Sequence, residues 1–434
     1  MTALNTCLEK SYIYKMGSSW VGDGLITADV PTWKRHRKLL NPTFSQHVLD
    51  GFLAIFNRQA ALLAQDLEAE FLILLSKSNN NSCISETAVG ISLDDRSVID
   101  TKYKKAVETA FDVLAQRLAS FWLHPDFIYR FTAMKQKEDI AMATLHNMSR
   151  SVSKNTYFTG SVTEKGSWPL TQESWSLSNR VPFLPFGYGT QNSNVYCHAA
   201  RRFIAFLDLL LDLAEDGSFT DDQIQQELDT LIAAGHDTSS RALISTLVLV
   251  GTHLDVQKKI YEEILAVLGS SADLCKEDMA KLVYTEAVIK EVLRISPVTP
   301  IIARDIDKEL KLSKQPNYLL ILPENYTLPA GSGCIVSLWG IHRLPIWGPD
   351  RMEFKPERWL DPSKLPQNPG CYGAFSLGRR NCIGKNYALM SVKTNLVHLV
   401  RKFHITADYS KVKRKYDLLL KYVEGHHIAL ELRN

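Results

Sequence analysis

One long helical stretch near the middle of the chain constrains the fold most. It begins at TDDQ, Thr220 to Gln223, where a hydroxyl residue is followed three residues later by glutamine, the pattern of a helix capping box. The stretch IQQELDTLIAAGHDTSSRALISTLVLV follows at once and predicts a long helix. The chain should therefore be built mainly from helices.

Helical spacing of apolar residues also covers much of the remaining chain, before and after this stretch. The predicted helices are Phe44 to about Lys77, Tyr103–Leu123, Lys135–Arg150, a segment from His253 to Gly269, and Lys281–Ile295. Alternating apolar residues predict short strands at Leu319–Leu322 and Cys334–Leu338, and a last hairpin near KYVEGHHIALELR. We predict a single, mainly α domain over residues 1–434 with a small β part.

The stretch from Ser151 to Ala199 departs from this pattern. It is rich in Ser, Thr and Asn and contains VPFLPFGYGT, so its composition predicts loop rather than helix. A structureless loop of this length is uncommon inside a compact domain. A mobile lid, a disordered segment and a splice or assembly artefact remain as interpretations.

Charge and cysteine usage argue against several functional classes. The formal charge is only +3 over 434 residues, which does not favour a nucleic-acid binder driven by bulk charge. The seven cysteines are scattered, with no C-x-x-C pair of a zinc or thioredoxin-like site, and they fit a reducing compartment. The longest apolar runs are much shorter than a bilayer requires, and no signal peptide is recognisable.

The stretch FSLGRRNCIGKNYALM places a lone cysteine, Cys382, in a basic turn just before a predicted helix. A helix start, nearby cations such as Arg379 and Arg380, or a metal would each stabilise a thiolate. Gly378 and Gly384 remove side chains where a flat cofactor could approach the backbone. The alternative is an ordinary buried free cysteine.

This stretch resembles the haem-binding signature F-x-x-G-x-R-x-C-x-G of the cytochrome P-450 haem-thiolate monooxygenases. The matching residues are Phe375, Gly378, Arg380, Cys382 and Gly384. The resemblance implies that Cys382 is the proximal iron ligand and that Arg380 approaches a haem propionate. It covers about Val21 to the C-terminus, apart from Ser151–Ala199.

The long helix carries AAGHDTS, which is unfavourable for a helix interior. A back-bonded threonine is one interpretation. A local opening of the helix, where Asp237 and Thr238 relay protons to an oxygen ligand, is the other. The family pattern A-G-x-[DE]-T matches here and implies the second. It gives His236 no required role.

Two further motifs match the family. In EVLR, Glu291 and Arg294 share one helix face, which by itself indicates a surface ion pair. The resemblance implies instead a buried structural network with Arg358 of FKPERW. In WKRHR, Trp33 and Arg37 also share a face, and the resemblance makes them propionate ligands together with Arg304.

The segments ETAVGI, HRLPIWGPD and FSLGRRNCIG resemble sequences of the microsomal family-4 branch, especially those of its arthropod members. Ala234 stands where that branch often has a glutamate that bonds covalently to haem, so we expect haem b held without an ester link. The branch's N-terminal membrane anchor is absent from this chain, which we interpret as an N-terminally truncated form.

The resemblance implies insertion of one oxygen atom of O₂ into a hydrophobic substrate, such as a fatty acid, terpenoid or xenobiotic. The sequence has no flavin or dinucleotide module, so electrons would come from NADPH through cytochrome P-450 reductase, with cytochrome b5 as an optional partner. The expected location is the cytosolic face of the endoplasmic reticulum membrane. The rivals are a non-catalytic, truncated haem-binding relic and a haem-thiolate isomerase or dehydratase.

Basic clusters at Lys34–Arg35, Lys258–Lys259 and Lys411–Lys415 are candidate docking sites for an acidic redox partner. Solvated surface is the more ordinary interpretation of each one.

Overall fold

The computed structural model describes residues 7–69, 101–160, 206–215, 217–311, 326–423 and 425–433. Its centre is helix α10, which runs from Asp221 to Thr252. The predicted capping box is present: the Thr220 hydroxyl accepts from the Gln223 N–H at 3.3 Å, and the Gln223 side chain accepts from the Thr220 N–H at 3.1 Å. The sequence therefore specified where this helix begins.

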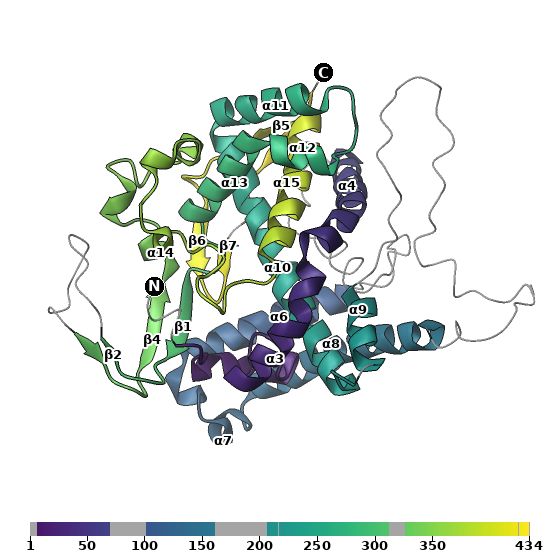
Figure 1. The fold of residues 1–434 in the computed structure, drawn as a ribbon, viewed down its shortest axis with the longest axis vertical. Helices are drawn as coiled ribbons and strands as arrows, with labels where there is room; N and C mark the ends of the chain where they lie inside the picture. Colours follow the sequence, from purple (N-terminus) through teal and green to yellow (C-terminus); the bar gives the residue numbers. More distant parts are fainter. Residues whose placement is uncertain are drawn as a thin grey trace, which may run out of the picture.

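The other helices lie around α10 (Figure 1). The α-helices are α2 (Ser18–Val21), α3 (Val30–Leu40), α4 (Gln46–Ala69), α6 (Thr101–Ala119), α7 (Asp126–Tyr129), α8 (Ala133–Gly160), α9 (Phe206–Glu215), α11 (Leu254–Leu268), α12 (Lys276–Lys281), α13 (Val283–Ile295), α14 (Leu338–Ile341) and α15 (Lys385–Lys402). Short 3-10 helices join them: η1 (Tyr12–Gly17), η2 (Asn41–Phe44), η3 (Phe121–Leu123), η5 (Pro345–Trp347), η6 (Pro356–Trp359), η7 (Pro362–Lys364) and η8 (Pro369–Cys371).

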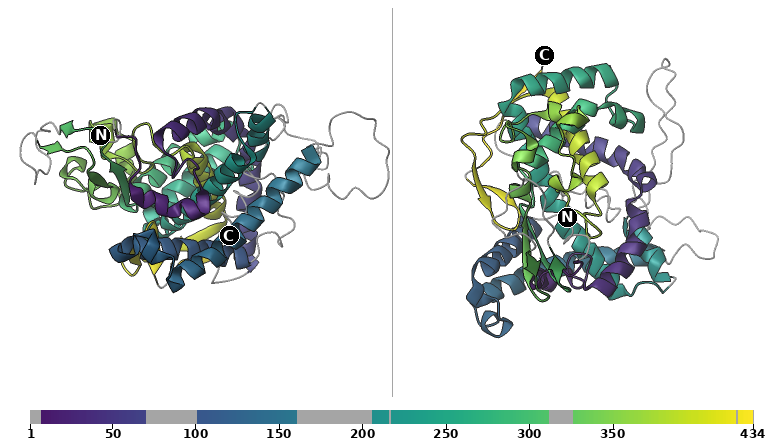
Figure 2. Two further views of the ribbon diagram at one scale, coloured as in Figure 1. Left: turned by 90° about the horizontal axis from the view of Figure 1, so that it is seen from below. Right: turned by 60° about the vertical axis from the view of Figure 1, so that its left-hand side comes forward.

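The two halves of α10 contribute to two separate hydrophobic cores. Its C-terminal half, including the fully buried Leu247, packs with α4, α11, α13 and α15. Its N-terminal half, including the fully buried Ile224, packs with α3, α6, α8 and α9. The views in Figures 1 and 2 place these two groups of helices at opposite ends of the molecule. Because α10 belongs to both cores, it fixes their relative position.

The strands form antiparallel pairs. They are β1 (Ile301–Asp305) with β4 (Gly333–Ser337), β2 (Leu310–Lys311) with β3 (Thr327–Leu328), β5 (Phe403–Thr406) with β8 (Ala429–Leu432), and β6 (Lys413–Tyr416) with β7 (Leu420–Val423). The β1–β4 register sets Arg304 opposite Cys334. An isolated bridge from Lys10 near the N-terminus reaches the same arginine.

Several predicted elements need correction. The last hairpin was wrong: β7 pairs with β6, whereas β8 crosses to β5 after the helix α15. Helix α8 continues to Gly160, ten residues into the stretch predicted as loop, and the remainder of Ser151–Ala199 lies outside the described residues. The predicted strand Leu319–Leu322 also lies outside them. Long-range strand pairing left no local signal in the sequence.

Within the described ranges, no helix combines the length and apolar character needed to cross a bilayer.

Candidate active site

The loop around Cys382 connects η8 to α15 and is shaped by its own backbone. The Cys382 N–H donates to the Phe375 carbonyl at 2.9 Å. Gly378 has φ +75°, a conformation that favours glycine. At Gly384, a built Cβ would lie 3.9 Å from the Cys382 sulfur, an ordinary contact. The protein neighbours therefore leave room for a side chain at Gly384, which fits the idea that a bound group occupies that space.

The Cys382 side chain is exposed, although protein atoms crowd around it on several sides. Burial by these atoms raises the pKa of the thiol, and a backbone hydrogen bond at Gly384 and the charges of Arg37, Lys10 and Lys385 oppose this only in part. We expected the arginines just before the cysteine to favour the thiolate. The cations that act most on the thiol are instead Arg37, Lys10 and Lys385, and a bound metal would stabilise the deprotonated sulfur further.

Arg380 points away from the sulfur into the N-terminal part of the chain. Its guanidinium donates to the carbonyls of Leu8 and Ala28, each at 2.9 Å, and lies 4.4 Å above the Trp33 ring. Trp33 is buried and therefore supports Arg380 through its ring face. Burial, followed by the charge of Arg304, lowers the pKa of Arg380 to about 10.

Arg304 on β1 is 1% exposed, and hydrogen bonds satisfy its guanidinium only in part. One terminal nitrogen donates to its neighbour's carbonyl, that of Ala303, at 2.7 Å. Its buried Nε has no hydrogen-bond partner in the described part of the chain. Burial also lowers the pKa of this guanidinium. A buried cation in this state is incompletely satisfied and fits an anionic ligand.

Arg37 joins helix α3 to the cysteine loop. It donates to the Asn381 carbonyl at 2.8 Å and to the Asn381 side-chain oxygen at 3.1 Å, next to Cys382. Its Nε donates to Asn41 at 2.8 Å. Among the described residues, neither Arg37, Arg304 nor Arg380 has a carboxylate within ion-pair distance. Their donor set suits the carboxylates of a haem, so the residues present fit this cofactor.

Asp237 and Thr238 lie on α10, and both are already engaged. Asp237 accepts from its neighbour one turn on, Arg241, at 2.6 and 2.9 Å. The Thr238 hydroxyl donates to the Ala234 carbonyl at 2.7 Å. The helix is continuous through this region, so the predicted local opening is not present. The back-bonded threonine that we considered as the alternative is what the geometry displays.

Glu291, Arg294 and Arg358 meet in a buried network, not at the surface. Two Arg294 nitrogens donate to Glu291 at 2.8 Å, and Arg358 Nε donates to it at 3.0 Å. The Trp359 indole adds a bond at 2.9 Å, which sequence reasoning missed although the residue follows Arg358 directly. The Glu291 and Arg294 side chains are both 0% exposed, which rules out the surface ion pair that spacing alone suggested.

The comparisons with known proteins settle the family. The family model described as cytochrome P-450 matches residues 6–426. The chain belongs to the cytochrome P-450 family. It is 30% identical to cytochrome P-450 4V2 of Mus musculus over 98% of this chain and 77% of the relative. It is 29% identical to cytochrome P-450 4c3 of Drosophila melanogaster (95% and 73%) and 30% identical to 4d8 of the same fly (98% and 88%).

As a cytochrome P-450, the protein is an oxidoreductase of the haem-thiolate monooxygenase class, with haem b as its cofactor and a cysteine thiolate as the iron ligand. It requires a redox partner and acts on a hydrophobic substrate. The mainly helical architecture with small sheets is that of the family.

His342 is a second residue that sequence reasoning missed in this cytochrome P-450. It is fully buried, and its Nε2 accepts from the Gly373 N–H at 3.0 Å, which leaves Nδ1 to donate to the Arg294 carbonyl at 3.1 Å. It thus connects the Glu291 network to the segment that leads into the cysteine loop. Burial lowers its pKa to about 3, so the ring is neutral. Only its place in HRLPIWGPD hinted at a role.

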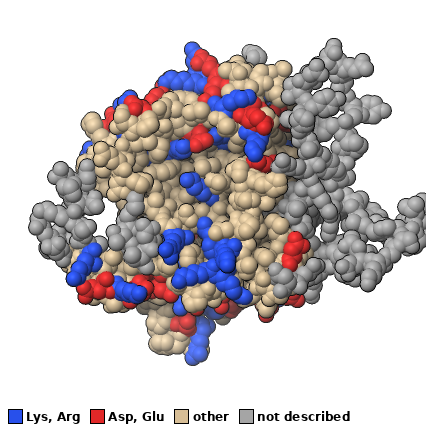
Figure 3. All heavy atoms as spheres, in the orientation of Figure 1, with Lys and Arg blue, Asp and Glu red and all other residues tan. Residues whose placement is uncertain are grey.

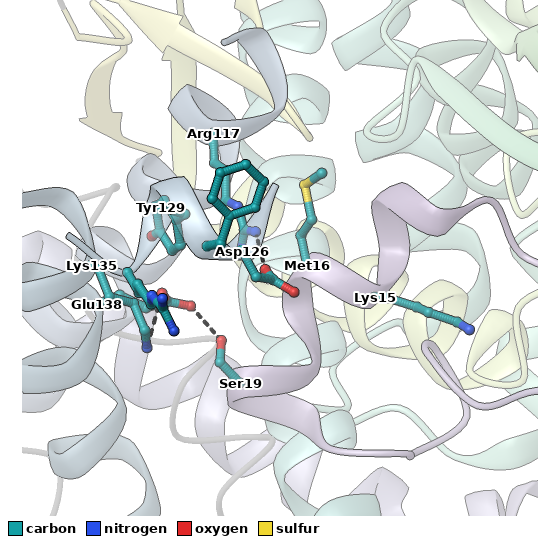
Figure 4. Close-up of a pocket in the computed structure, with 10 residues that line it drawn as sticks. Lys15, Met16, Ser19, Arg117, Asp126, Tyr129, Lys135 and Glu138 are labelled. Carbon is teal, nitrogen blue, oxygen red and sulfur yellow. Dashed lines mark hydrogen bonds and ion pairs between the residues drawn. The ribbon is translucent and has the colours of Figure 1, made fainter. Parts of the chain in front are cut away.

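A pocket of about 350 Å³ lies elsewhere, between η1, α2 and the α6–α8 region (Figure 4). Its lining is strongly charged and includes Arg117, Asp126 and Glu138, with Arg117 stacked 3.9 Å from the Tyr129 ring centroid. None of its lining residues belongs to the cysteine loop, α10 or β1. Because a substrate bound there would lie away from the Cys382 loop, this pocket is not the candidate substrate site.

Proposed function

We propose that this protein oxidises a small hydrophobic molecule, such as a fatty acid, terpenoid or xenobiotic, with electrons taken from NADPH through cytochrome P-450 reductase. Cytochrome b5 is an optional second electron donor in this proposal. One observation carries the proposal: the accessible Cys382 thiol follows Asn381, which Arg37 contacts, and Arg37, Arg304 and Arg380 have no carboxylate within ion-pair distance in the described chain. A thiolate-ligated dianionic cofactor satisfies both features.

Each residue then has a distinct task. Cys382 binds the iron, Arg37, Arg304 and Arg380 hold the carboxylates, and Trp33 supports Arg380. Phe375, Gly378 and Gly384 shape the loop, and Glu291, Arg294 and Arg358 fix the segments behind it. The bidentate contacts of Arg294 and the orphaned Nε of Arg304 support this division.

When bound, haem b supplies the activation of O₂, one atom of which enters the substrate while the other leaves as water. The protein's residues determine where protons and water go. Thr238 holds a proton on its hydroxyl, which donates to the Ala234 carbonyl at 2.7 Å. Asp237, which is partly exposed and paired with Arg241, exchanges protons with solvent once that ion pair opens.

A basic face around α3 is the proposed docking site for the reductase. Lys34, Lys38, Arg379 and Lys385 are exposed beside the loop of Cys382. Figure 3 displays Lys and Arg gathered in the lower middle of this face. The other candidate clusters are neutralised: Lys259 pairs with Glu357 at 2.6 Å and Lys411 with Asp408 at 3.1 Å. Unpaired cations attract an acidic partner more strongly.

The docking face is tested by charge reversal. Lys34→Glu with Lys38→Glu should lower the rate of electron transfer from the reductase, with a weakened salt dependence, because steering by exposed charges is screened by ions. Lys411→Glu is the matched control, since its charge is already paired. Equal losses in both variants would reject α3 as the docking face.

The function is tested in two steps. The reduced carbon-monoxide complex of the purified protein should display the red-shifted Soret band of thiolate-ligated haem, and Cys382→Ala should abolish it. NADPH consumption and product formation with reductase and lipid substrates then separate an enzyme from a haem-binding relic. A normal Soret shift without NADPH-dependent product from a panel of lipids, terpenoids and drugs would favour the relic.

We also propose the cytosolic face of the endoplasmic reticulum as the location, supported by the resemblance to the microsomal branch and by the need for a membrane-bound reductase. Co-sedimentation of the native protein with microsomes tests this. Recovery in the cytosolic supernatant would reject it.

A further inference from the structure

The segment just before η1 is joined to two of the residues that face the proposed haem site. The Asp305 N–H donates to the Glu9 carbonyl at 3.2 Å, and Lys10 forms a backbone bridge with Arg304. Arg380 donates to the carbonyl of Leu8. Residues 8–10 therefore lie between β1 and the Arg380 side chain, and Lys10 has a fixed position beside both arginines.

The Lys10 side chain remains among these cations rather than turning fully into solvent. It is half-buried, and its Nζ lies 4.0 Å from the centroid of the Tyr14 ring. Burial, then the charges of Arg304 and Arg380, lower its pKa well below the usual value, while the Cys382 sulfur acts in the opposite direction. Within the described residues, no ion pair joins Lys10 to a carboxylate.

Such a cluster is unfavourable by itself. Like charges repel, and removing each from water costs free energy unless an anion compensates. A flexible lysine escapes this cost by extending into solvent unless something holds it. The buried Nε of Arg304 has no hydrogen-bond partner among the described residues, so a hydrogen-bond acceptor is lacking at the same place. The cluster therefore indicates a ligand that carries more than one negative charge.

We propose that Lys10 binds a haem carboxylate and completes, with Arg304 and Arg380, a three-cation site for the two propionates. This inference rests on the proposed haem-binding roles of the two arginines. It adds a residue outside the motifs that identify the family in this sequence.

Tyr14 acts as a positioning residue for this site. Its ring lies beneath the Lys10 ammonium, and its hydroxyl accepts from the Ala303 N–H at 3.3 Å. The ring face favours the charged ammonium, and the hydroxyl anchors η1 to β1. Tyr14 thereby keeps Lys10 at the edge of the sheet that carries Arg304.

The test compares haem with its dimethyl ester, which has no propionate charge. Holoproteins of wild type, Lys10→Met and Lys15→Met are mixed with excess apomyoglobin, and haem loss is followed by absorbance. Lys15 is the matched control because it is exposed on the same segment and lines the separate charged pocket. The same proteins are then refilled with the dimethyl ester and measured again.

Lys10→Met should lose haem at least about tenfold faster than wild type, as expected when one partner of a desolvated charge pair is removed. Its loss of the dimethyl ester should match wild type, and Lys15→Met should match wild type with both. Lys10→Arg should restore most of the retention of haem. Circular dichroism and the Soret position establish that each variant is folded and thiolate-ligated.

Two results would overturn the inference: unchanged haem loss in Lys10→Met, or equal acceleration with haem and ester. If Lys10→Met does not fold, Lys10→Gln undergoes the same comparison. Failure of the proposed function is distinguishable, because wild type itself would then lack the thiolate Soret band.

Discussion

The guanidinium of Arg294 holds both carboxylate oxygens of Glu291, with its Nε and one terminal nitrogen each at 2.8 Å. The two residues lie one helical turn apart on α13, and neither is exposed to solvent. Arg358, from η6, approaches the same carboxylate from a different part of the chain. The pair formed by Glu291 and Arg294 within one helix thus also holds the segments behind the cysteine loop.

Glu291→Gln should lower the free energy of unfolding by about 3–5 kcal/mol, because it leaves buried guanidinium groups uncompensated. Urea unfolding followed by circular dichroism measures this. The control is Glu262→Gln, which breaks an exposed pair with Lys258 at 3.8 Å and should cost less than about 1 kcal/mol. Similar losses in the two variants would contradict a special role for burial.

His342 should make stability depend on pH. Its folded pKa of about 3 lies below the ordinary value near 6.5, so the unfolded chain binds the proton first. Its contribution to stability is complete above about pH 6.5 and is lost as pH falls toward about 3. His342→Phe, which removes two hydrogen bonds, should be less stable by about 1–3 kcal/mol near neutrality. The difference from wild type should shrink between about pH 6.5 and about pH 4.5 in urea titrations. A difference that stays constant with pH would refute the buried neutral histidine.

Gly24 and Gly51 should respond in opposite ways to alanine. At Gly24 an added Cβ would lie 1.9 Å from Thr230 Oγ1 and 3.0 Å from the Gln226 carbonyl of α10, so Gly24→Ala should destabilise the fold by about 1–3 kcal/mol. At Gly51, inside α4, the added Cβ meets no neighbour within 4 Å. Gly51→Ala should stabilise by up to about 1 kcal/mol. Thermal unfolding of both variants checks the signs.

Thr238 offers a way to separate a structural hydroxyl from a functional one. Thr238→Val keeps the shape but removes the proton, whereas Thr238→Ser keeps the proton. Valine should raise the peroxide released per NADPH consumed several-fold, and serine should remain near wild type. If valine alters only thermal stability and leaves this ratio unchanged, the hydroxyl serves the helix through its bond to Ala234 and not the reaction.

Local signals predicted local structure well. The hydroxyl and glutamine of TDDQ are three residues apart, so their capping contacts needed no information from the rest of the chain. The prediction of the C-terminal strands failed for the opposite reason. Strand β8 pairs with β5 across more than twenty residues, and the predicted hairpin and the observed pairing fit the same alternation of apolar residues.

The candidate site also divides into features that consecutive residues predict and features that depend on distant parts of the chain. The motif around Cys382 and its resemblance indicated the cofactor, because ligand type and turn glycines are written in consecutive residues. The directions in which the arginine side chains point are not encoded in consecutive residues. Arg380, for example, donates to the carbonyls of Leu8 and Ala28, which are more than 350 residues away in sequence. His342 and Lys10 escaped notice because a single histidine or lysine has no distinguishing neighbours.

The sequence by itself determined the helical architecture, the start of α10, the spacing that lets Glu291 and Arg294 meet, and the identity of the thiol. Tertiary structure decided which charges are buried, which are left unpaired, and that burial raises the pKa of Cys382 despite nearby cations. The physical reason is that desolvation and Coulomb energies depend on what packs around a group in space. Arg304 and Lys10 are almost 300 positions apart in the chain and become neighbours only when β1 forms.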